Sequence, residues 1–355
     1  MFKNQIKTKK RGLLPAFCVL LATAFLLSAF TLGISAVQSK RDFGAEEVIL
    51  GGMPFGIKFS TEGIVVIGFS DIDGISKVQN PAYLAGIRAK DVILKVNGKS
   101  VSDAEELTRT VEGSEGKAIS LTYKRGQVEK TVSITPVYSQ TEKKFKTGIW
   151  VKDSGAGIGT VTYILPETNE FGGLGHGICD GDTGELIRMR QGDVLNVTVH
   201  AVKKGVAGAP GELKGHFNTK QIGRLYSNTD CGVFGKLTTL PEQPAEIIRV
   251  GTRNVLEEGE ACLYCTLDGG AKAEYKIEIS AINRDASGSK CFVIKVVDPA
   301  LIEKTGGIVQ GMSGSPIVQN GRLVGAVTHV MINDPTVGYG IFIENMLRTM
   351  TQYME

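Results

Sequence analysis

The sequence predicts a mainly β protein in which two folded units follow an N-terminal apolar segment. Its 355 residues exceed one ordinary domain, and 42% of them are hydrophobic, which is enough to fill two cores. The 45 glycines, against only 7% aromatic residues, indicate many tight turns between short strands. Short segments of alternating apolar and polar residues recur from about residue 48 onward, as expected for a β-rich chain.

The N-terminal region has the pattern of a membrane anchor. Residues 12–37 contain no charged side chain, and about 26 residues at about 1.5 Å each exceed a hydrocarbon core of about 30 Å. A basic cluster without acidic residues precedes this run: Lys3, Lys7, Lys9, Lys10 and Arg11. We therefore expect residues 1–11 in the cytoplasm, 12–37 as an uncleaved transmembrane signal-anchor, and the rest outside the cytoplasm. A signal peptide cleaved near Ser35 and Ala36 is the alternative.

Charge and cysteine content exclude several classes of function. The net charge is only +3, and five of the positive charges lie in the N-terminal cluster, so the folded part lacks the basic face that nucleic acid requires. Five cysteines follow the apolar segment, and Cys262 and Cys265 form a C-x-x-C without the second pair that a zinc site needs. On a strand these two side chains would point to opposite faces. We expect no metal and no cofactor; a disulfide remains open.

The first folded unit, residues 48–137, follows a polar linker at residues 38–47. Alternating patterns predict strands at 56–59, 63–68 and 91–96, and later at 118–123 and 129–134. Pro81 can open a short helix that Gly86 closes, and Asn97-Gly98 is a two-residue hairpin turn. A second helix at 104–111 has cap residues at 102–103.

The same segment resembles a PDZ domain of the bacterial protease-associated type. The resemblance rests on the runs Asn-Pro-Ala, Ala-Gly-Ile, Lys-Asp-Val-Ile and Val-Asn-Gly within residues 80–98. It implies that an extended peptide pairs with a strand edge and lies against the second helix. The expected peptide-binding residues are Phe55, Gly56, Ile57, Lys58 and Phe59. A PDZ fold that serves only as a spacer or brake is the alternative.

The second folded unit, residues 138–355, contains a serine in a glycine-rich turn. Only residues 344–354 have a convincing helical pattern, so a β-barrel or β-sandwich is expected. In Gly311-Met-Ser-Gly-Ser-Pro316, the glycines let the amides of Gly311 and Ser313 point into one pocket, where they can stabilise an oxyanion. A strand and a hairpin follow, as in chymotrypsin-like peptidases, whereas the α/β-hydrolase motif would need a glycine at Ser315. Ser313 is the predicted nucleophile.

Four histidines compete for the role of general base. His176 is favoured because glycines on both sides allow close approach to another loop. His200 lies in an alternating strand pattern and His216 in a polar turn. His329, at the end of the strand after the serine hairpin, is the second choice.

The whole arrangement resembles the stage IV sporulation protein B peptidases of endospore-forming bacteria. The motifs are Gly-His-Gly-Ile at His176, Val-Asp-Pro at Asp298, Gly-Met-Ser-Gly-Ser-Pro-Ile at Ser313 and the later Ala-Val-Thr-His-Val. Carried over by motif, His176 is the base, Ser313 the nucleophile and Asp298 the acid that orients the imidazole. Spacing alone favours Asp230 as the acid, while Asp180 and Asp182 lie very near the histidine in sequence.

The resemblance also implies a biological role. Such peptidases are anchored in the inner forespore membrane and face the intermembrane space, where they cleave their own N-terminal region and a regulator on the facing membrane. That cut triggers activation of the late mother-cell sigma factor. Residues 38–47 are the expected self-cleavage region, and the PDZ ligand could be the protein's own chain. The alternatives are a non-catalytic PDZ scaffold and a general extracytoplasmic quality-control serine protease. Cleavage specificity and oligomeric state cannot be predicted from the sequence.

Overall fold

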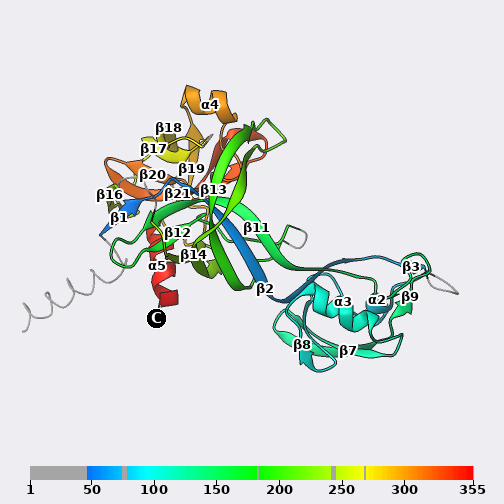
Figure 1. Ribbon diagram of the computed structural model, residues 1–355. Helices are drawn as coiled ribbons and strands as arrows, with labels where there is room; N and C mark the ends of the chain where they lie inside the picture. The colour runs from blue at the N-terminus through cyan, green and yellow to red at the C-terminus, as the bar shows by residue number, and fades with distance from the viewer. Residues whose placement is uncertain (1–45, 74–77, 182–183, 241–244, 268, 355) are drawn as a thin grey trace, which may run out of the picture. The chain divides into compact units, whose positions relative to one another are not determined.

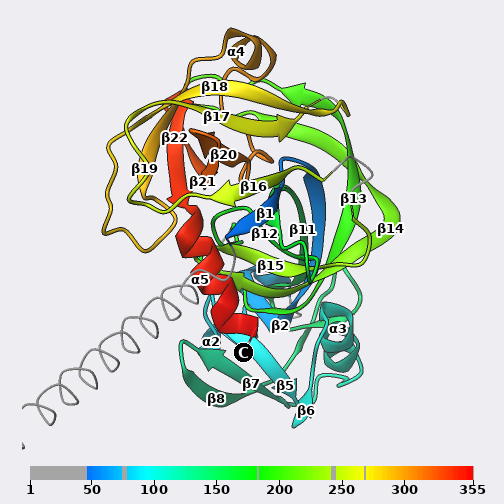
Figure 2. The same cartoon turned by 90° about the vertical axis from the view of Figure 1, so that its left-hand side faces the viewer.

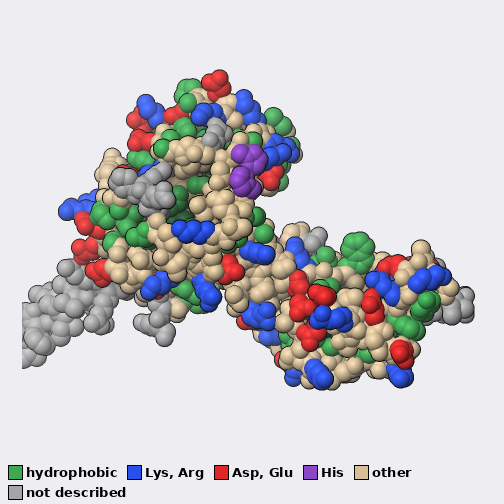
Figure 3. Space-filling view, viewed as in Figure 1, with side chains coloured by type: hydrophobic (Ala, Val, Ile, Leu, Met, Phe, Trp, Pro, Cys, Tyr) green, Lys and Arg blue, Asp and Glu red, His purple; other side chains and the backbone are tan. Residues whose placement is uncertain are grey.

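The structure is a computed structural model that describes residues 46–73, 78–181, 184–240, 245–267 and 269–354. The predicted anchor, residues 12–37, and the basic segment before it lie outside these ranges, as does most of the 38–47 linker. Among the described residues, none of the helices has the length and hydropathy needed to cross a bilayer. On the face shown in Figure 3, basic and acidic side chains are interspersed, without a large patch of one sign.

Six antiparallel strands of the peptidase close into a first β-barrel. They are β2 (Pro54–Phe69), β11 (Ile149–Ile164), β12 (Glu170–Gly173), β13 (Met189–Lys203), β14 (Glu212–Thr229) and β15 (Gly232–Leu237). β2 pairs with β13, β13 with β14, β14 with β15, β15 with β12, β12 with β11, and β11 again with β2. A closed ring of strands leaves no unpaired sheet edge along the paired segments.

A second six-stranded barrel follows along the chain. Its strands are β17 (Gly259–Thr266), β18 (Lys272–Ser280), β19 (Phe292–Val296), β20 (Pro316–Gln319), β21 (Arg322–Met331) and β22 (Asp334–Phe342). β17 pairs with β18 and β20, β19 with β18 and β22, and β21 with β20 and β22, which closes the ring. The sequence predicts a chymotrypsin-like β-barrel for this region, and the structure forms two antiparallel barrels.

Three further elements complete the peptidase (Figures 1 and 2). β1 (Glu47–Leu50) pairs with β11 and with β16 (Ile247–Val250), and β16 pairs with β21 of the second barrel. The C-terminal helix α5 (Ile343–Met354) follows β22, as the sequence predicts. Among the described residues, the largest buried apolar cluster fills the second barrel and extends to β1, β11, β13, β14 and β15, and a separate cluster fills the first barrel.

The PDZ unit has its own core. Its elements are α2 (Pro81–Leu84), β5 (Val92–Val96), β6 (Lys99–Ser100), α3 (Ala104–Glu112), β7 (Ile119–Arg125) and β8 (Val128–Ile134), with the short pairs β3 (Ile72–Asp73) and β4 (Val78–Gln79), and β9 (Val137–Tyr138) and β10 (Phe145–Lys146). Asp103 caps α3 through its carboxylate, and Asn97 and Gly98 both have positive φ, as their predicted turn requires. The buried apolar side chains of this unit run from Ile64 to Ile134.

The predicted peptide-binding strand of the PDZ unit belongs instead to the peptidase. In β2, residues 55–59 pair with β11 along one edge and with β13 along the other. The side chains of Phe55, Ile57 and Phe59 are buried in the core of the first barrel. Both edges of this strand are therefore occupied, and Phe55, Gly56, Ile57, Lys58 and Phe59 cannot add a peptide strand. The prediction that they do so is wrong in this structure.

The second unit contains one helix that the strand pattern did not predict. α4 (Pro299–Thr305) lies beside β18 in both views (Figures 1 and 2). Its N-cap is Asp298, and Pro299 occupies the first helical position, where a missing N–H costs nothing. Gly306, with φ of 75°, ends the helix in the left-handed conformation.

Candidate active site

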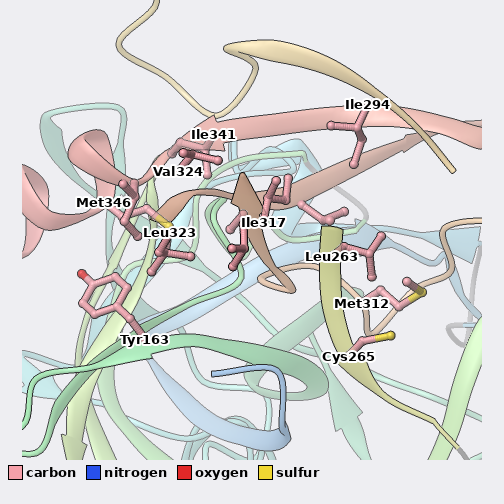
Figure 4. Packing of buried hydrophobic residues seen from close by; sticks show 14 of the residues in the cluster. Tyr163, Leu263, Cys265, Ile294, Met312, Ile317, Leu323, Val324, Ile341 and Met346 are labelled. Atoms are coloured by element: carbon pink, nitrogen blue, oxygen red, sulfur yellow. The ribbon is translucent and has the colours of Figure 1, made fainter. Parts of the chain in front are cut away.

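The serine loop between α4 and β20 is held in a tight turn. Gly311 and Gly314 have φ of 98° and 93°, a region that disfavours any side chain. The N–H of Gly314 donates to the Val327 carbonyl at 2.8 Å. Between the glycines, the side chain of Met312 is fully buried and packs in the second barrel near Leu263 (Figure 4). The buried Met312 side chain thus anchors the loop in the second-barrel core, while Ser313 remains at the surface of the barrel.

Two threonines of the first barrel bind the same loop. Thr160 of β11 donates two hydrogen bonds to the loop. Its N–H donates to the Ser313 carbonyl at 2.9 Å, and its hydroxyl donates to the Gly311 carbonyl at 2.8 Å. The buried hydroxyl of Thr162 donates to the Gly314 carbonyl at 2.7 Å. These bonds turn the loop carbonyls toward β11. They also join the two barrels at the position of the nucleophile.

The loop presents two N–H groups that can hold an oxyanion. Among the described residues, neither the N–H of Gly311 nor that of Ser313 donates to a backbone or side-chain acceptor. The neighbouring N–H groups of Met312, Gly314 and Ser315 are all bonded within the protein. Free, oriented N–H groups beside a serine hydroxyl are what stabilises the charge that develops on a carbonyl oxygen under attack. The predicted donors Gly311 and Ser313 fit this role.

The histidine loop is also held in an unusual conformation. Leu174 and Gly175 have φ of 64° and 68°, and Leu174 is a rare case of a branched side chain in this region. A Cβ on Gly175 would approach the side chains of Ile341 and Thr328 to 3.0 Å, so only glycine lets the loop lie this close to the second barrel. The sequence predicted such an approach from the glycines around His176.

Asn228 of β14 holds the segment that follows the histidine. Its Oδ1 accepts from the N–H of Ile178 at 2.8 Å, and its Nδ2 donates to the carbonyls of Ile178 and Ile187 at 2.9 Å each. One side chain thereby makes three hydrogen bonds to the backbone, as a neighbouring strand would otherwise do. This role has no local signal in the sequence, because nothing near position 228 indicates its partners 41 and 50 residues away.

A cavity of about 470 Å³ brings the predicted base and nucleophile together. His176, Gly311 and Ser313 all line it. The Nδ1 of His176 lies 2.8 Å from the Gly177 carbonyl, which favours the tautomer with the proton on Nδ1 and leaves Nε2 as an acceptor. The Ser313 hydroxyl donates to the Thr328 carbonyl at 2.8 Å, and no hydrogen bond joins it to His176 among the described residues. Such bonds often form only when substrate is present.

A second imidazole lies against the first. The rings of His176 and His329 have centroids 4.7 Å apart and are tilted by 36°. Burial lowers the pKa of His176 below its usual value, although the bond to the Gly177 carbonyl offsets part of this effect. Burial, together with His176 and Lys290, lowers the pKa of His329 to about 4. Both rings are therefore neutral near pH 7, and neutral imidazole is the form that accepts a proton from serine.

The acid predicted from the family motif is not beside the histidine. The Asp298 carboxylate accepts from the N–H groups of Lys276, Ala300 and Leu301 at 3.1, 2.9 and 3.2 Å, as the cap of α4. Burial raises the pKa of Asp298, but these backbone bonds outweigh burial and lower it below the usual value. In this structure Asp298 is a helix cap, which corrects the prediction that it orients His176. The Gly177 carbonyl takes that position.

The other acidic candidates lie nearer to the histidine loop. Asp180 is buried and pairs with Lys152 at 3.2 Å. Asp230 is exposed in the turn after β14. Burial raises the pKa of the Cys179 thiol, which lines the cavity, and the nearby charge of Asp230 raises this pKa further. Neither is hydrogen-bonded to His176 among the described residues. Asp182 lies outside them.

Of the five cysteines in the described ranges, only Cys179 lines the cavity. The five cysteines in the described ranges are free thiols, and these ranges contain no cluster of three or more ligands for a metal ion. Cys262 and Cys265 lie on β17; the first contacts Glu274 and the second is buried in the second-barrel core. Burial raises the pKa of the Cys265 thiol to about 12.

Comparison with known proteins agrees with this geometry. A family model described as SpoIVB peptidase S55 matches residues 143–347, more than half of the chain, and one described as PDZ domain matches residues 31–135. A probable CtpA-like serine protease of Staphylococcus aureus is 49% identical over 57 residues, which are 16% of this chain and 12% of that protein. Its Staphylococcus haemolyticus counterpart is 46% identical over the same length. The chain thus covers only a small part of these relatives.

Solved structures show weaker similarity. The HtrA-type protease AlgW with a tripeptide has 17% identity and a TM-score of 0.34, over 56% of each chain. The thermostable serine protease AL20 from an extremophilic microorganism has 13% identity and a TM-score of 0.31, over 56% of this chain and 92% of that one. The family assignment rests on the match over residues 143–347. The chain belongs to the SpoIVB peptidase S55 family and is a serine peptidase that carries a PDZ domain.

Proposed function

We propose that this peptidase is a sporulation signalling endopeptidase that cleaves its own N-terminal region and a membrane-bound regulator, and thereby triggers activation of the late mother-cell sigma factor. The observation that carries the chemistry is the shared cavity of His176 and Ser313 beside two free N–H groups. Membership of the SpoIVB peptidase family supports the biological setting. The proposed location is the forespore inner membrane, with the folded part facing the intermembrane space.

The reaction is acyl transfer to water. Ser313 Oγ attacks the carbonyl carbon of a peptide bond while Nε2 of His176 takes the hydroxyl proton. The N–H groups of Gly311 and Ser313 bond to the oxygen that becomes negative. His176 then gives its proton to the leaving amine, the C–N bond breaks, and an acyl-enzyme remains. A water molecule, deprotonated by His176, hydrolyses this ester and restores the Ser313 hydroxyl.

The acylation step requires the serine hydroxyl to exchange partners. In the resting site Ser313 Oγ bonds to the Thr328 carbonyl, whereas catalysis needs its proton directed to His176. We expect a rotation about the Cα–Cβ bond of Ser313 to make this exchange, since Ser313 and His176 line the same cavity. The Gly177 carbonyl stabilises the imidazolium through Nδ1–H, more weakly than a carboxylate would.

The PDZ unit is proposed to bring a substrate or regulatory peptide to the peptidase, with the protein's own chain as one ligand. Since residues 55–59 are paired on both edges, a peptide must use another part of the PDZ surface. The proposed protein substrate lies in the facing membrane. Residues 38–47 are the proposed self-cleavage region, directly before β1.

Self-processing of the full chain tests this function. The wild type and Ser313→Ala are produced in membranes, and their N-termini are mapped over time by mass spectrometry. A product with its new N-terminus between residues 38 and 47, absent in Ser313→Ala, is the expected result. Equal fragments in both variants would indicate a non-catalytic PDZ scaffold. Broad degradation of an unfolded protein such as casein, with no defined self-cleavage, would favour a quality-control protease instead.

A further inference from the structure

The catalytic cavity extends away from Ser313 along one glycine-rich strand. Gly155, Gly157 and Gly159 of β11 occupy alternate positions and therefore share one face of the strand, the face toward the first-barrel core. A Cβ on Gly155 would lie 2.5 Å from the ring of Phe59, and one on Gly159 only 2.1 Å from Leu174. At these two positions glycine is needed for packing within the protein.

Gly157 differs from its two neighbours. A Cβ at this position would meet nothing within 4 Å, and its φ is not in the positive region, so any residue could occupy it without strain. Gly157 nevertheless lines the cavity that contains Ser313 and His176. Neither packing within the protein nor backbone conformation thus requires a glycine at position 157. A glycine in a strand often marks a place where another chain approaches closely.

The walls of the cavity beside Gly157 are apolar. Ile57, which lies opposite Gly157 in the β2–β11 register, lines it together with Phe59, Leu174, Ile178 and Ile187. The one charged side chain in the wall, Lys152, is paired with the buried carboxylate of Asp180 at 3.2 Å. The lining therefore favours an apolar side chain over a charged one, since a charge would lose its hydration without gaining a free partner.

The outer edge of β11 is open at this point. Residues 154–158 pair with β2 on one edge, and no other described strand pairs with them. An extended peptide can add to such an edge through backbone hydrogen bonds. In an antiparallel pair, the residue directly opposite Gly157 directs its side chain to the same face of the sheet, which is the face toward the cavity.

We propose that the part of the cavity over Gly157 is a specificity pocket for a bulky aliphatic or aromatic side chain near the scissile bond, in a substrate whose backbone pairs with residues 156–158. This inference rests on the proposed endopeptidase function and assigns its substrate class. The space that Gly157 leaves is filled by the substrate, and Ile57 forms the floor beneath it.

The experiment measures specificity in two steps. First, the full-length wild type in mild detergent is incubated with a peptide library, and mass spectrometry of the products gives residue frequencies around each cut. Second, a matched pair of peptides, with Leu or Ala at the most selective position, is hydrolysed by the wild type, Gly157→Val and Ser154→Val. Ser154 is exposed on the opposite face of the same strand and does not line the cavity, so it is the control for a β-branched residue on β11.

The readout is the ratio of kcat/KM between the Leu and Ala peptides, which does not depend on the fraction of folded enzyme. We expect enrichment of bulky apolar residues at one position flanking the cut. Because one methylene in an apolar pocket changes specificity by about 10- to 200-fold, Gly157→Val should lower the Leu/Ala ratio at least about tenfold. Ser154→Val should keep the wild-type ratio.

Two results would overturn the inference alone: cleavage with no apolar preference at any flanking position, or an unchanged Leu/Ala ratio in Gly157→Val. A parallel reaction with a fluorophosphonate reports the serine chemistry by itself. Absence of both peptide cleavage and fluorophosphonate labelling of Ser313 in the wild type would refute the proposed function, and the pocket with it.

Discussion

Removal of the Asn228 side chain tests how the fold positions the general base. In the structure this amide makes three hydrogen bonds to the backbone of the segment that follows His176. Each bond contributes about 0.5–1.5 kcal/mol net, so Asn228→Ala should destabilise the closed segment by about 2–4 kcal/mol. That change increases the population of its open form by roughly 30- to 1,000-fold, at 1.4 kcal/mol per factor of ten.

Hydrogen exchange and active-site labelling measure the two consequences separately. The N–H of Ile178 donates to Asn228 Oδ1, and the N–H of Ile187 donates to the Ile178 carbonyl. Both amides should exchange faster in Asn228→Ala by a factor in that range. The rate of Ser313 labelling by a fluorophosphonate should fall by about 10- to 100-fold, since a misplacement of about 1 Å in a catalytic group has an effect of this size.

Asn218 provides the matched control. It lies on the same strand, β14, is half-buried, and its side chain makes a long bond of 3.4 Å to the Thr198 hydroxyl. Asn218→Ala should therefore change neither exchange at Ile178 nor labelling of Ser313. Wild-type exchange and wild-type labelling in a folded Asn228→Ala protein would refute the idea that this side chain holds the histidine loop.

Four further perturbations have expected outcomes. Gly314→Ala should abolish labelling of Ser313, because the new Cβ would lie 2.1 Å from the Thr160 carbonyl oxygen. The φ of 93° alone should lower the stability by at least about 1–3 kcal/mol. Normal labelling would contradict the described loop. Asp298→Ala should cost about 0.5–2 kcal/mol in urea unfolding while the pH profile of labelling keeps its midpoint; a shifted midpoint in the folded variant would instead indicate an acid that acts on His176. The labelling rate of the wild type should rise with pH with a midpoint below 6.5, since burial lowers the pKa of His176; a midpoint above 6.5 would be inconsistent with this burial. Stability should fall as the pH drops from 6.5 toward about 4, because the unfolded chain binds a proton on His329 before the folded protein does, and His329→Gln should lessen this loss; equal pH dependence in both proteins would exclude the effect.

Turns, helix caps and the C-terminal helix could be predicted from the sequence, because residues close together in the chain determine them. The Asn97-Gly98 turn, the Asp103 cap and the C-terminal helix all depend on neighbouring residues. Ser313 and His176 were identified because each lies among glycines, and the structure places both in one cavity.

The pairing partners of the long strands could not be predicted. The two strands predicted at 56–59 and 63–68 form one strand, β2, which continues through Gly63 at φ of 79°. Residues 55–59 of this strand pair within the peptidase, although their sequence resembles a PDZ strand. Which edges stay free depends on β11 and β13, strands that begin about 90 and 130 residues after residue 59. Pairing at such separations leaves no local trace in the sequence.

The role of Asp298 did have a local signal that the motif match obscured. Asp followed by Pro is a typical start of a helix, with the carboxylate as N-cap and proline at the first helical position. The positions of Asn228 and of the His176–His329 ring pair had none, because both depend on contacts between segments far apart in the chain.

The central claim is that Ser313 is the nucleophile and His176 its base. The most direct measurement is the site and rate of covalent modification when the full chain reacts with a fluorophosphonate, mapped by peptide mass spectrometry in the wild type and in His176→Ala. We expect a single adduct on Ser313 and a rate at least about 10⁴-fold lower in the variant. An adduct on another residue, or equal labelling of Ser313 in both proteins, would contradict the account.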